Sequence, residues 1–370
     1  MKIIIDTQTL KTTLSIIMLA VPGHNIDPAL ENISIQVNNK SLTITAFNNE
    51  LCIIKNIDIV EGEDGNFLIP AKLFFEIVKK TECKNIILEI DEKMMINITA
   101  GQSKYSLVGM EFDRYPHIPR LNPNNIENIS INQRNFTQMS SQVMFAVSSS
   151  EDKPVYKGIL FEQENNSLTV VAVDGFRLAM CKRETNSDKN IKFIVPASTI
   201  TELLRIIKPS SDENYEIELK ISDKYMLIEL EDATVISRLI VGDFLNYHEA
   251  IKGKTIKTLT VNRQQLLSSI ERTSLLISDR IKNPLKLEFE SDSIKLSSIT
   301  PMGKASDTCP CRSDGESIVM GFNNRFLIDA LKNTDSDEIK IEICGQIAPL
   351  KIMPLEGDDF LFIVVPMRIS

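Results

Sequence analysis

The sequence contains no tryptophan and only 3 histidines, and aromatic residues make up only 6% of the chain. The core must therefore be built mainly from aliphatic side chains and methionine. The histidines, His24, His117 and His248, stand in no arrangement suited to a catalytic triad. The signatures GxxxxGK[ST], GxGxxG and HExxH, typical of nucleotide and zinc-protease sites, are also absent from the sequence. The sequence therefore predicts a protein without a catalytic site, a cofactor or a metal ion.

The 6 cysteines are scattered, and only Cys309 and Cys311 stand close together, with no histidine near them. This spacing favours reduced thiols over a disulfide framework or a zinc site, and so a cytoplasmic protein. No apolar run is long enough for a transmembrane helix, and no membrane partner is expected. The apolar stretch near the N-terminus, residues 14–21, has counterparts in the middle of the chain, where a signal peptide cannot lie.

Charge is moderate and of mixed sign: 25% of the residues are charged, the formal net charge is -9 and the sequence pI is about 5.1. These values, with 43% hydrophobic residues, are typical of a globular protein. An acidic chain does not favour tight, sequence-specific DNA binding, which usually needs a basic domain. Weak and non-specific contact through a local basic surface remains open.

The chain repeats itself three times. Stretches that start at Ile3, Ile129 and Leu259 each read as a short apolar strand, a polar residue and a helix. The polar residues are expected to cap the helices, because their side-chain oxygens can accept hydrogen bonds from free N–H groups of the first turn. These predicted N-caps are Asp6, Asn132 and Asn262.

Two further sets of segments follow the same spacing. Alternating strands begin at Ser41, Ser167 and Ser293, which are 126 residues apart. Buried strands lead into amphipathic helices at Pro70, Pro196 and Phe322, again 126 apart. We therefore predict three homologous domains, residues 1–122, 127–250 and 257–370, of the α+β class. Each is expected to pack two helices on a mostly antiparallel sheet.

The stretch VVAVDGFRLAM, residues 170–180, contains Asp174 and Gly175 between two apolar strands. An Asp-Gly pair in this position predicts a β-hairpin with a type I′ turn. Asp174 aligns with Asn48, 126 residues earlier, so the turn belongs to the shared fold and Asp174 is interpreted as structural. An alternative is a hydrolase that uses Asp174 and Arg177 in its active site.

Open sheet edges suggest association between chains. The strand SKYSLVGM, residues 103–110, is expected to form such an edge, and edges of this kind invite pairing with another chain. If the rotation between repeats is regular, head-to-tail pairing closes a ring. The expected interface residues are Tyr105 and Leu107 at one end, and Leu276 and Ile277 beside the charged Asp279, Arg280 and Lys282 at the other.

Basic residues recur on the predicted helices of all three repeats. Taken singly, each is an ordinary residue of a solvated helix surface. Together they suggest a basic rim on an acidic body, suited to holding a polyanion loosely. His24 is interpreted as an exposed residue of its loop. The basic residues expected to face such a polyanion are Lys72, Lys79, Lys80, Arg205, Lys208 and Arg263.

Over essentially its whole length the chain resembles the bacterial DNA sliding clamps, the beta subunits of DNA polymerase III. The resemblance rests on the tripled repeat and on the segments VAVDGFRLA, FNNRFLIDALK and VVPMRIS. It implies a non-catalytic processivity factor in DNA replication, a homodimeric head-to-tail ring of six domains that encircles double-stranded DNA without sequence specificity. Helices would line the hole. A tethered polymerase rebinds before it diffuses away.

The resemblance also implies a pocket between the second and third domains for short clamp-binding peptides. Its expected partners are the replicative polymerase catalytic subunit, the clamp loader, and other polymerases and repair proteins. Departures from the family pattern at Val173, Phe176, Leu245 and Glu249 predict a more apolar wall, a differently charged rim and an altered peptide preference. The residues that match the pocket are Tyr156, Val173, Asp174, Gly175, Phe176, Arg177, Leu178, Leu245, Asn246, Tyr247, Ala250, Asn323, Phe326, Ile347, Pro349, Val364, Val365, Pro366, Met367 and Arg368.

A second function from another class is a three-domain repeat adaptor that binds peptides but not DNA. The basic helix residues distinguish the two functions, because only a DNA-encircling protein needs them. Solution mass and turnover distinguish both functions from the hydrolase.

Overall fold

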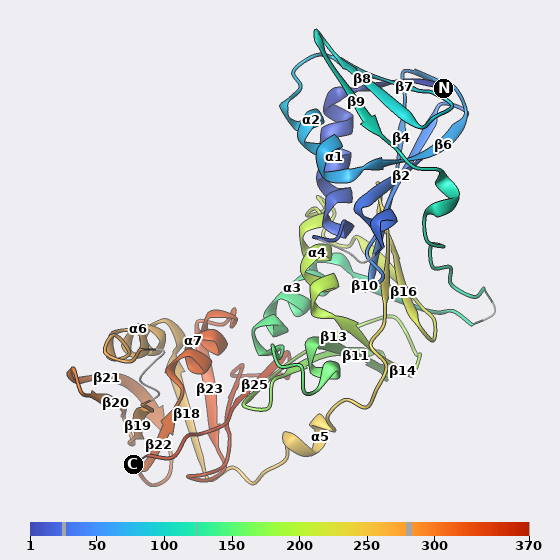
Figure 1. The fold of residues 1–370 in the computed structure, drawn as a ribbon. Helices are drawn as coiled ribbons and strands as arrows, with labels where there is room; N and C mark the ends of the chain where they lie inside the picture. Colours follow the sequence, from blue (N-terminus) through green and yellow to red (C-terminus); the bar gives the residue numbers. More distant parts are fainter. Residues whose placement is uncertain (24–26, 124, 279–282, 370) are drawn as a thin grey trace. The chain divides into compact units, whose positions relative to one another are not determined.

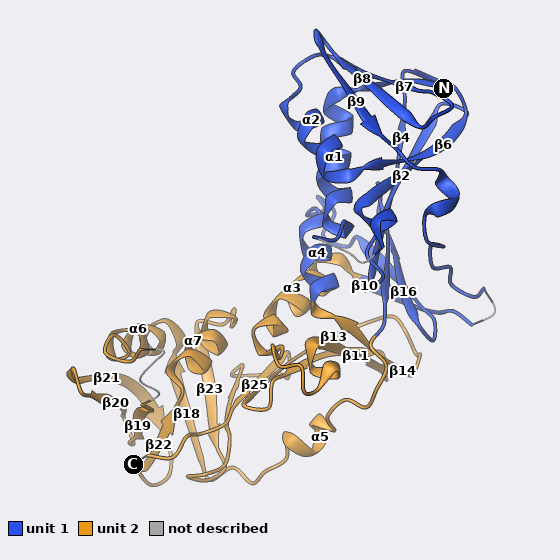
Figure 2. Cartoon of the chain, viewed as in Figure 1, with its two compact units in different colours: residues 1–131, 198–239 blue, residues 132–197, 240–370 orange. Residues whose placement is uncertain are grey.

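The computed structural model describes the whole chain except residues 24–26, 124, 279–282 and 370 (Figure 1). It divides into two compact units (Figure 2). Unit 1 comprises Met1–Ile131 and Ser198–Leu239, and unit 2 comprises Asn132–Ala197 and Ile240–Ser370. The division runs through the second of the three predicted domains. His24 and the predicted charged neighbours Asp279, Arg280 and Lys282 lie outside the described residues.

Unit 1 holds a five-stranded sheet in the order β5-β1-β7-β8-β9 and an eight-stranded sheet in the order β10-β15-β16-β17-β4-β3-β2-β6. Its strands are β1 (Lys2–Asp6), β2 (Asn32–Asn38), β3 (Ser41–Phe47), β4 (Leu51–Asp58), β5 (Glu61–Gly62), β6 (Gly65–Pro70), β7 (Asn85–Ile90), β8 (Met95–Ala100), β9 (Ser103–Val108), β10 (Glu127–Asn132), β15 (Glu216–Ile221), β16 (Tyr225–Glu229) and β17 (Thr234–Arg238). Its helices are α1 (Thr7–Ile17), α2 (Ala71–Lys80) and all but the first residue of α4 (Ala197–Ile206), with short 3-10 turns at Met18–Ala20, Pro28–Glu31 and Phe112–Arg114.

Unit 2 holds one twelve-stranded sheet in the order β14-β11-β12-β13-β25-β24-β23-β18-β21-β20-β19-β22. Its strands are β11 (Gly158–Glu164), β12 (Ser167–Val173), β13 (Arg177–Glu184), β14 (Ile191–Pro196), β18 (Lys257–Asn262), β19 (Leu285–Phe289), β20 (Ser293–Thr300), β21 (Gly303–Ser313), β22 (Ile318–Phe322), β23 (Glu338–Ile343), β24 (Leu350–Met353) and β25 (Phe360–Val364). Its helices are α3 (Gln133–Val143), α5 (Tyr247–Ala250), α6 (Arg263–Thr273) and α7 (Asn324–Lys332), with 3-10 turns at Met144–Ala146 and Pro154–Lys157.

The three predicted N-caps are confirmed. The Asp6 carboxylate accepts a hydrogen bond from the N–H of Thr9 at 2.8 Å, three residues ahead. Asn132 and Asn262 cap α3 and α6 in the same way, from the residue three positions further on, at 3.2 and 3.0 Å. The predicted strands β3, β12 and β20 start at Ser41, Ser167 and Ser293 as the spacing requires. The α+β class with antiparallel strand pairing is likewise confirmed.

The helices lie against the sheets through their apolar stripes. Figure 1 shows α6 and α7 side by side on one face of the sheet in unit 2, where α6 contacts β18, β20 and β21. In unit 1, α1 contacts α2 and the strands β3 and β4. Leu10 and Leu14 of α1 are fully buried, as a helix with apolar residues four apart on one face predicts. None of the described helices has the length and apolar character needed to cross a membrane.

The turn after β12 differs from the predicted type I′. Gly175 has a φ of 92°, but Asp174 is not among the described residues with positive φ, so only one central position takes the left-handed region. Instead, a carboxylate oxygen of Asp174 accepts hydrogen bonds from the N–H groups of Phe176 and Arg177 at 2.9 and 3.0 Å. Asn48 does the same in the first repeat. A side chain thus replaces part of the backbone bonding that a two-residue turn would need.

Neighbouring repeats are joined by strand pairing in two places, once inside each unit. In unit 1 the last strand of the second repeat, β17, pairs with β4 of the first, with Ser237 opposite Leu51. In unit 2 the last strand of the third repeat, β25, pairs with β13 of the second, with Val364 opposite Arg177. Leu51 and Arg177 are 126 residues apart, so the two junctions use the same register.

Candidate functional site

Arg177 is held at the end of the β12–β13 turn by two carboxylates and two rings. Its Nε donates to Asp174 at 2.9 Å, and Nη1 donates to Asp329 of α7. Its guanidinium carbon lies 4.5 Å from the ring centroid of Phe326 and 5.4 Å from that of Phe145. The Arg177 side chain is only 13% exposed. Arg177 therefore fastens the second repeat to α7 of the third, with its charge balanced inside the protein.

This geometry does not support the hydrolase alternative. One oxygen of Asp174 accepts the two backbone N–H groups of the turn, and the other accepts from Arg177. A general base needs a lone pair directed at a substrate, and three of the roughly four acceptor sites of this carboxylate are already bonded to its own loop. The described residues also contain no cluster of His, Cys, Asp or Glu that could hold a metal ion.

An exposed aromatic surface lies beside Arg177 and its four partners. Phe176 is 62% exposed, and its ring stacks on Phe326 with a centroid separation of 6.2 Å. The backbone carbonyl of Phe176 accepts from the N–H of Val365 at 2.9 Å, which ties the turn to the C-terminal segment. Asn323 caps α7 by accepting from the N–H of Arg325 at 3.0 Å. One large aromatic face, that of Phe176, therefore remains exposed and can contact a partner.

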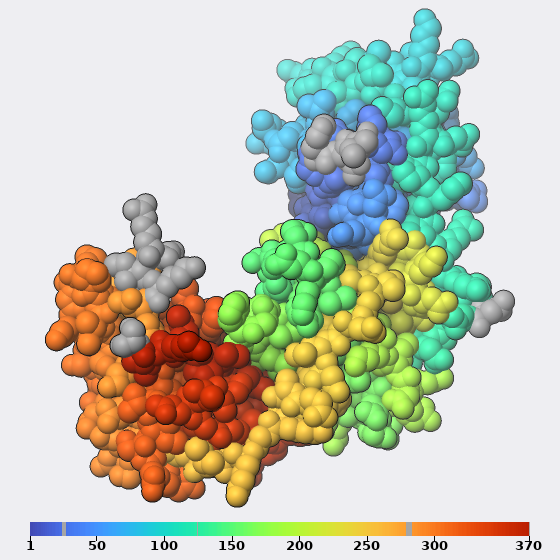
Figure 3. All heavy atoms as spheres, turned by 60° about the horizontal axis from the view of Figure 1, so that its bottom comes forward, coloured from blue at the N-terminus to red at the C-terminus, as the bar shows by residue number. Residues whose placement is uncertain are grey.

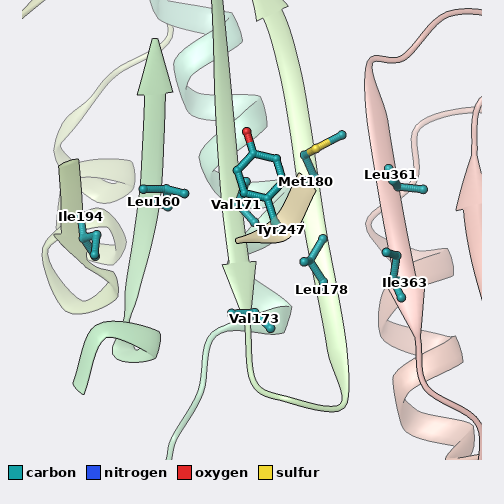
Figure 4. Packing of buried hydrophobic residues seen from close by; sticks show 9 residues of the cluster. All are labelled: Leu160, Val171, Val173, Leu178, Met180, Ile194, Tyr247, Leu361 and Ile363. Atoms are coloured by element: carbon teal, nitrogen blue, oxygen red, sulfur yellow. The ribbon is translucent and has the colours of Figure 1, made fainter. Parts of the chain in front are cut away.

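The second group of predicted pocket residues lies on one face of the sheet (Figure 4). Val173 and Leu178 pair across β12 and β13 and are almost fully buried. They belong to a cluster that β11, β14, β25 and the segment 240–251 complete, and Tyr156 and Leu245 are half-buried against it. The buried residues of this cluster are Leu160, Val171, Val173, Leu178, Met180, Ile194, Tyr247, Leu361 and Ile363. Val173 and Leu178 are therefore the floor below the predicted pocket, whereas Tyr156 and Leu245 reach its surface.

Segment 240–251 is fixed over this floor by a polar group. The Tyr247 hydroxyl donates to the Glu162 carboxylate, which also lies 3.3 Å from Lys192 and 3.5 Å from His248. Burial acts to raise the pKa of Glu162, but the Tyr247 hydrogen bond and the Lys192 charge outweigh it and lower that pKa. Burial, followed by the bond to Glu162, raises the pKa of Tyr247. Glu162 is therefore a charged anchor for the segment.

The remaining predicted pocket residues come from segments that border these two groups. Val364 is fully buried in β25, and Val365 follows it at 37% exposure. Met367 bonds to the backbone of Gly321, next to the start of α7. The atoms of segment 240–251 and of the C-terminal segment lie next to each other on one face of unit 2 (Figure 3). Ile347 and Pro349 lie in the β23–β24 loop, Ala250 ends α5, and Pro366 and Arg368 lie in the C-terminal tail.

The residues predicted to face DNA fall into two kinds. Lys72, Lys79 and Lys80 are exposed on α2, and Arg205 and Lys208 are exposed at the end of α4, where they pair with Glu202 and Asp232. Arg263 differs. Its guanidinium donates to the carbonyl oxygens of Leu331 and Ser336, at 3.3 and 3.0 Å, so it holds α6 against the end of α7.

The predicted interface residues lie at two free strand edges. Tyr105 and Leu107 are on β9, the last strand of the five-stranded sheet. At the other end of the chain, β21 pairs with β20 from Gly303 to Pro310 and with β18 only from Cys311 onwards. Leu276 lies next to this edge, because a Cβ built on Gly303 would be 3.8 Å from it. Among the described residues, the 303–310 segment therefore has one side unpaired.

Sequence reasoning missed the partners that hold the site together. Asp329 and Phe145 complete the clamp on Arg177, Glu162 anchors Tyr247, and Phe244 packs edge-on against Tyr156 with centroids 5.5 Å apart. Asp329 stands three residues after Phe326 on one helix face, and this spacing was the only signal available. The other contacts join residues distant in the chain, which no local pattern reveals.

Comparison with known proteins agrees with this architecture. The family models for the N-terminal, central and C-terminal domains of the DNA polymerase III beta subunit match residues 1–119, 130–246 and 251–368, in that order. Together they leave only short segments of the chain unmatched.

Individual relatives match over nearly the whole chain. The beta sliding clamp of Halalkalibacterium halodurans is 28% identical over 384 residues, covering 100% of both chains. That of Staphylococcus aureus strain Mu50 is 28% identical over 370 residues, covering 96% of both. The crystal structure of the DNA polymerase sliding clamp from Bacillus subtilis superposes with a TM-score of 0.94 at 25% identity, covering 100% of both chains. The chain therefore belongs to the family of DNA polymerase III beta subunits, and its function is that of a sliding clamp, a processivity factor that is not itself an enzyme.

Proposed function

We propose that two copies of this chain join head to tail into a cytoplasmic ring of six domains. Each copy contributes three of them, residues 1–122, 127–250 and 257–370. The ring encircles double-stranded DNA and tethers its partners through the surface around Phe176. The observation that carries this proposal is the repeated junction. β17 pairs with β4 and β25 pairs with β13 in one register. The equivalent strands that remain are β9, the last strand of the first repeat, and β21 of the third repeat, and among the described residues neither has such a partner.

The register of the missing junction follows from the two that exist. Tyr105 of β9 corresponds to Val235 of β17, because each faces a fully buried isoleucine of the preceding strand, Ile98 or Ile228. Val235 lies opposite Ile53 on β4. Tyr105 should therefore lie opposite the residue two repeats after Ile53.

Two steps of 126 residues lead from Ile53 to Ala305. In an antiparallel ladder, Tyr105 opposite Ala305 places Leu107 opposite Gly303. Gly303 is the residue beside Leu276, so the two apolar side chains of β9 would meet the apolar residues at the end of α6. The pairing continues both sheets into the second copy and covers both free edges.

The ring predicts a dimer in solution whose mass is twice the 41.7 kDa of the chain. Replacing Tyr105 and Leu107 by aspartate should convert it to monomer, because two carboxylates would be buried at each junction without partners. Sedimentation equilibrium measures both states. Circular dichroism of the variant checks the fold, since both side chains lie on an edge strand. Aspartates at Val60 and Val241, exposed apolar residues away from the two edges, provide the matched control.

A wild-type chain that stays monomeric at cellular concentrations would contradict the ring. In that case the adaptor that binds peptides but not DNA becomes the better description. A variant that remains dimeric would move the interface away from β9.

The proposed DNA-facing surface consists of the exposed basic residues of α2 and α4. Contact with phosphates through such side chains is non-specific and screened by salt, which suits a ring that must slide. Arg263 is not included in this surface, because its guanidinium donates to carbonyl oxygens and so supports α6. The residues proposed to face DNA are Lys72, Lys79, Lys80, Arg205 and Lys208.

The proposed peptide site is the surface above the floor in unit 2. Half-buried Tyr156 and Leu245 and the exposed ring of Phe176 offer apolar contacts, and the neighbouring turn and tail offer backbone groups. Its proposed partners are the replicative polymerase catalytic subunit, the clamp loader, and other polymerases and repair proteins that carry short clamp-binding peptides. The remaining border residues, Gly175, Ala250, Asn323, Ile347, Pro349, Pro366 and Arg368, are proposed to shape its rim.

Removing residues 366–370 is expected to weaken binding of such a peptide at least about tenfold, which corresponds to about 1.4 kcal/mol of lost contact. The deletion must begin after Val365, because Val364 is fully buried in β25 and pairs with Arg177. Fluorescence anisotropy of a labelled peptide measures the affinity, and sedimentation shows that the dimer is intact. Unchanged affinity would exclude the tail from the site.

A further inference from the structure

Both junctions inside the chain are reinforced by ion pairs at neighbouring positions. Where β17 meets β4, Asp232 lies 2.7 Å from the Nζ of Lys55, whose side chain is only 5% exposed. Where β25 meets β13, Lys182 pairs with Asp358 at 2.5 Å and Arg183 lies 3.7 Å from Asp359. In each case an acidic residue of the hairpin before the last strand meets a basic residue near the end of the facing strand.

Among the described residues, the corresponding positions of the third junction supply no such pair. With Tyr105 opposite Ala305, the residue that takes the place of Asp232 and Asp359 is Gln102. The facing positions, two repeats after Lys55 and one repeat after Lys182, are Asp307 and Thr308. Asp307 is acidic and already bonded to Arg272 of its own chain at 2.6 Å. These described positions therefore do not supply the opposite charges that face each other at the other two junctions.

Two lysines take their place, and they carry the same sign. The register that sets Tyr105 opposite Ala305 sets Lys104 opposite Ser306 and Ser106 opposite Lys304. Lys104 and Lys304 are both exposed, and the described residues include no ion pair for either. Lys104 and Lys304 are sequence neighbours of Tyr105 and Ala305, and successive side chains of a strand point to opposite faces. Both lysines therefore project from the sheet face opposite to that of Tyr105 and Ala305, where they are diagonal neighbours. Diagonal side chains are about 7–8 Å apart, within reach of long side chains.

We propose that a repulsive contact weakens the junction between copies, with Lys104 of one chain opposed to Lys304 of the other. This inference rests on the proposed head-to-tail ring. Main-chain pairing and the apolar contacts of β9 hold the junction, while the two internal junctions keep attractive ion pairs. Salt therefore tightens the junction between copies by screening this repulsion.

Charge reversal tests the pairing. Lys304→Glu should turn the diagonal repulsion into attraction and lower the Kd of the dimer. A change of about 5-fold at each junction gives about 25-fold for the dimer, because two junctions form together. Lys104→Glu should act equally. The double variant Lys104→Glu with Lys304→Glu restores like charges and should return the Kd close to that of the wild type. Lys93→Glu, an exposed turn residue with the same change of charge, is the control.

Sedimentation measures each Kd between about 0.1 and 1 M sodium chloride, over which the Debye length falls from about 10 to about 3 Å. The wild-type dimer should tighten with salt relative to the dimer of Lys304→Glu. A dimer whose Kd is the same in the single variants, the double variant and the control overturns the charge inference and leaves the ring standing. A chain that does not dimerise overturns both.

Discussion

Replacing Arg177 by alanine is expected to lower the free energy of unfolding of unit 2 by about 3 kcal/mol. The guanidinium lies between the rings of Phe145 and Phe326 and bonds to Asp174 and Asp329. Its removal leaves a cavity between the rings and takes away the side-chain partner of one oxygen of Asp174, whose side chain is only 15% exposed. Asp329 is 41% exposed, so water replaces part of its lost bond and limits the cost.

Urea denaturation followed by far-ultraviolet circular dichroism measures this loss. Arg205→Ala is the matched control, because Arg205 forms its ion pair at 62% exposure and should contribute less than about 0.5 kcal/mol. Arg177→Lys separates the two causes. It keeps the charge but loses the planar contact with the rings, and should cost about half as much as alanine. Equal stability of Arg177→Ala and Arg205→Ala would contradict a stabilising role for the contacts of Arg177.

The repeat was the part of the fold most accessible from sequence, because it depends on local chemistry. An N-cap needs only a short polar side chain before a helix, and Asp6, Asn132 and Asn262 all satisfy this locally. The strand and helix starts follow from apolar periodicity in the same way. The type I′ turn failed because Asp174 has an oxygen that can bond to the next backbone N–H groups, a choice that the dipeptide pattern alone does not reveal.

The candidate site was less accessible, because its geometry depends on contacts between distant segments. The family resemblance assigned Val173 and Leu178 to the pocket, and the structure shows that both side chains are buried on the sheet face beneath it. Arg263 showed the same limit: its position on a helix suggested an exposed cation, while the neighbouring end of α7 offers it two carbonyl oxygens. In both cases the residue types were visible in the sequence, but the partners that each side chain meets in the fold were not.

Reversing four basic charges on α2 and α4 is expected to abolish retention on closed circular DNA. The variant replaces Lys72, Lys79, Arg205 and Lys208 with glutamate. A dimeric ring would then carry eight negative charges where it had eight positive ones, facing a polyanion across the hole. Loading by the clamp loader followed by gel filtration of the DNA complex measures the retained fraction. We expect at least about a tenfold loss, since each phosphate contact contributes to a steep dependence on charge.

Net charge alone could produce the same result, so the control must match it. Lys40, Lys93, Lys224 and Lys254 are exposed lysines in turns and connecting segments away from the helices. Replacing these four by glutamate changes the charge by two units at each position, so both variants move from -9 to -17. The control should stay on circular DNA. If the helix variant is retained as well as its control, then the helices do not face DNA, and the chain would fit the adaptor that binds peptides alone.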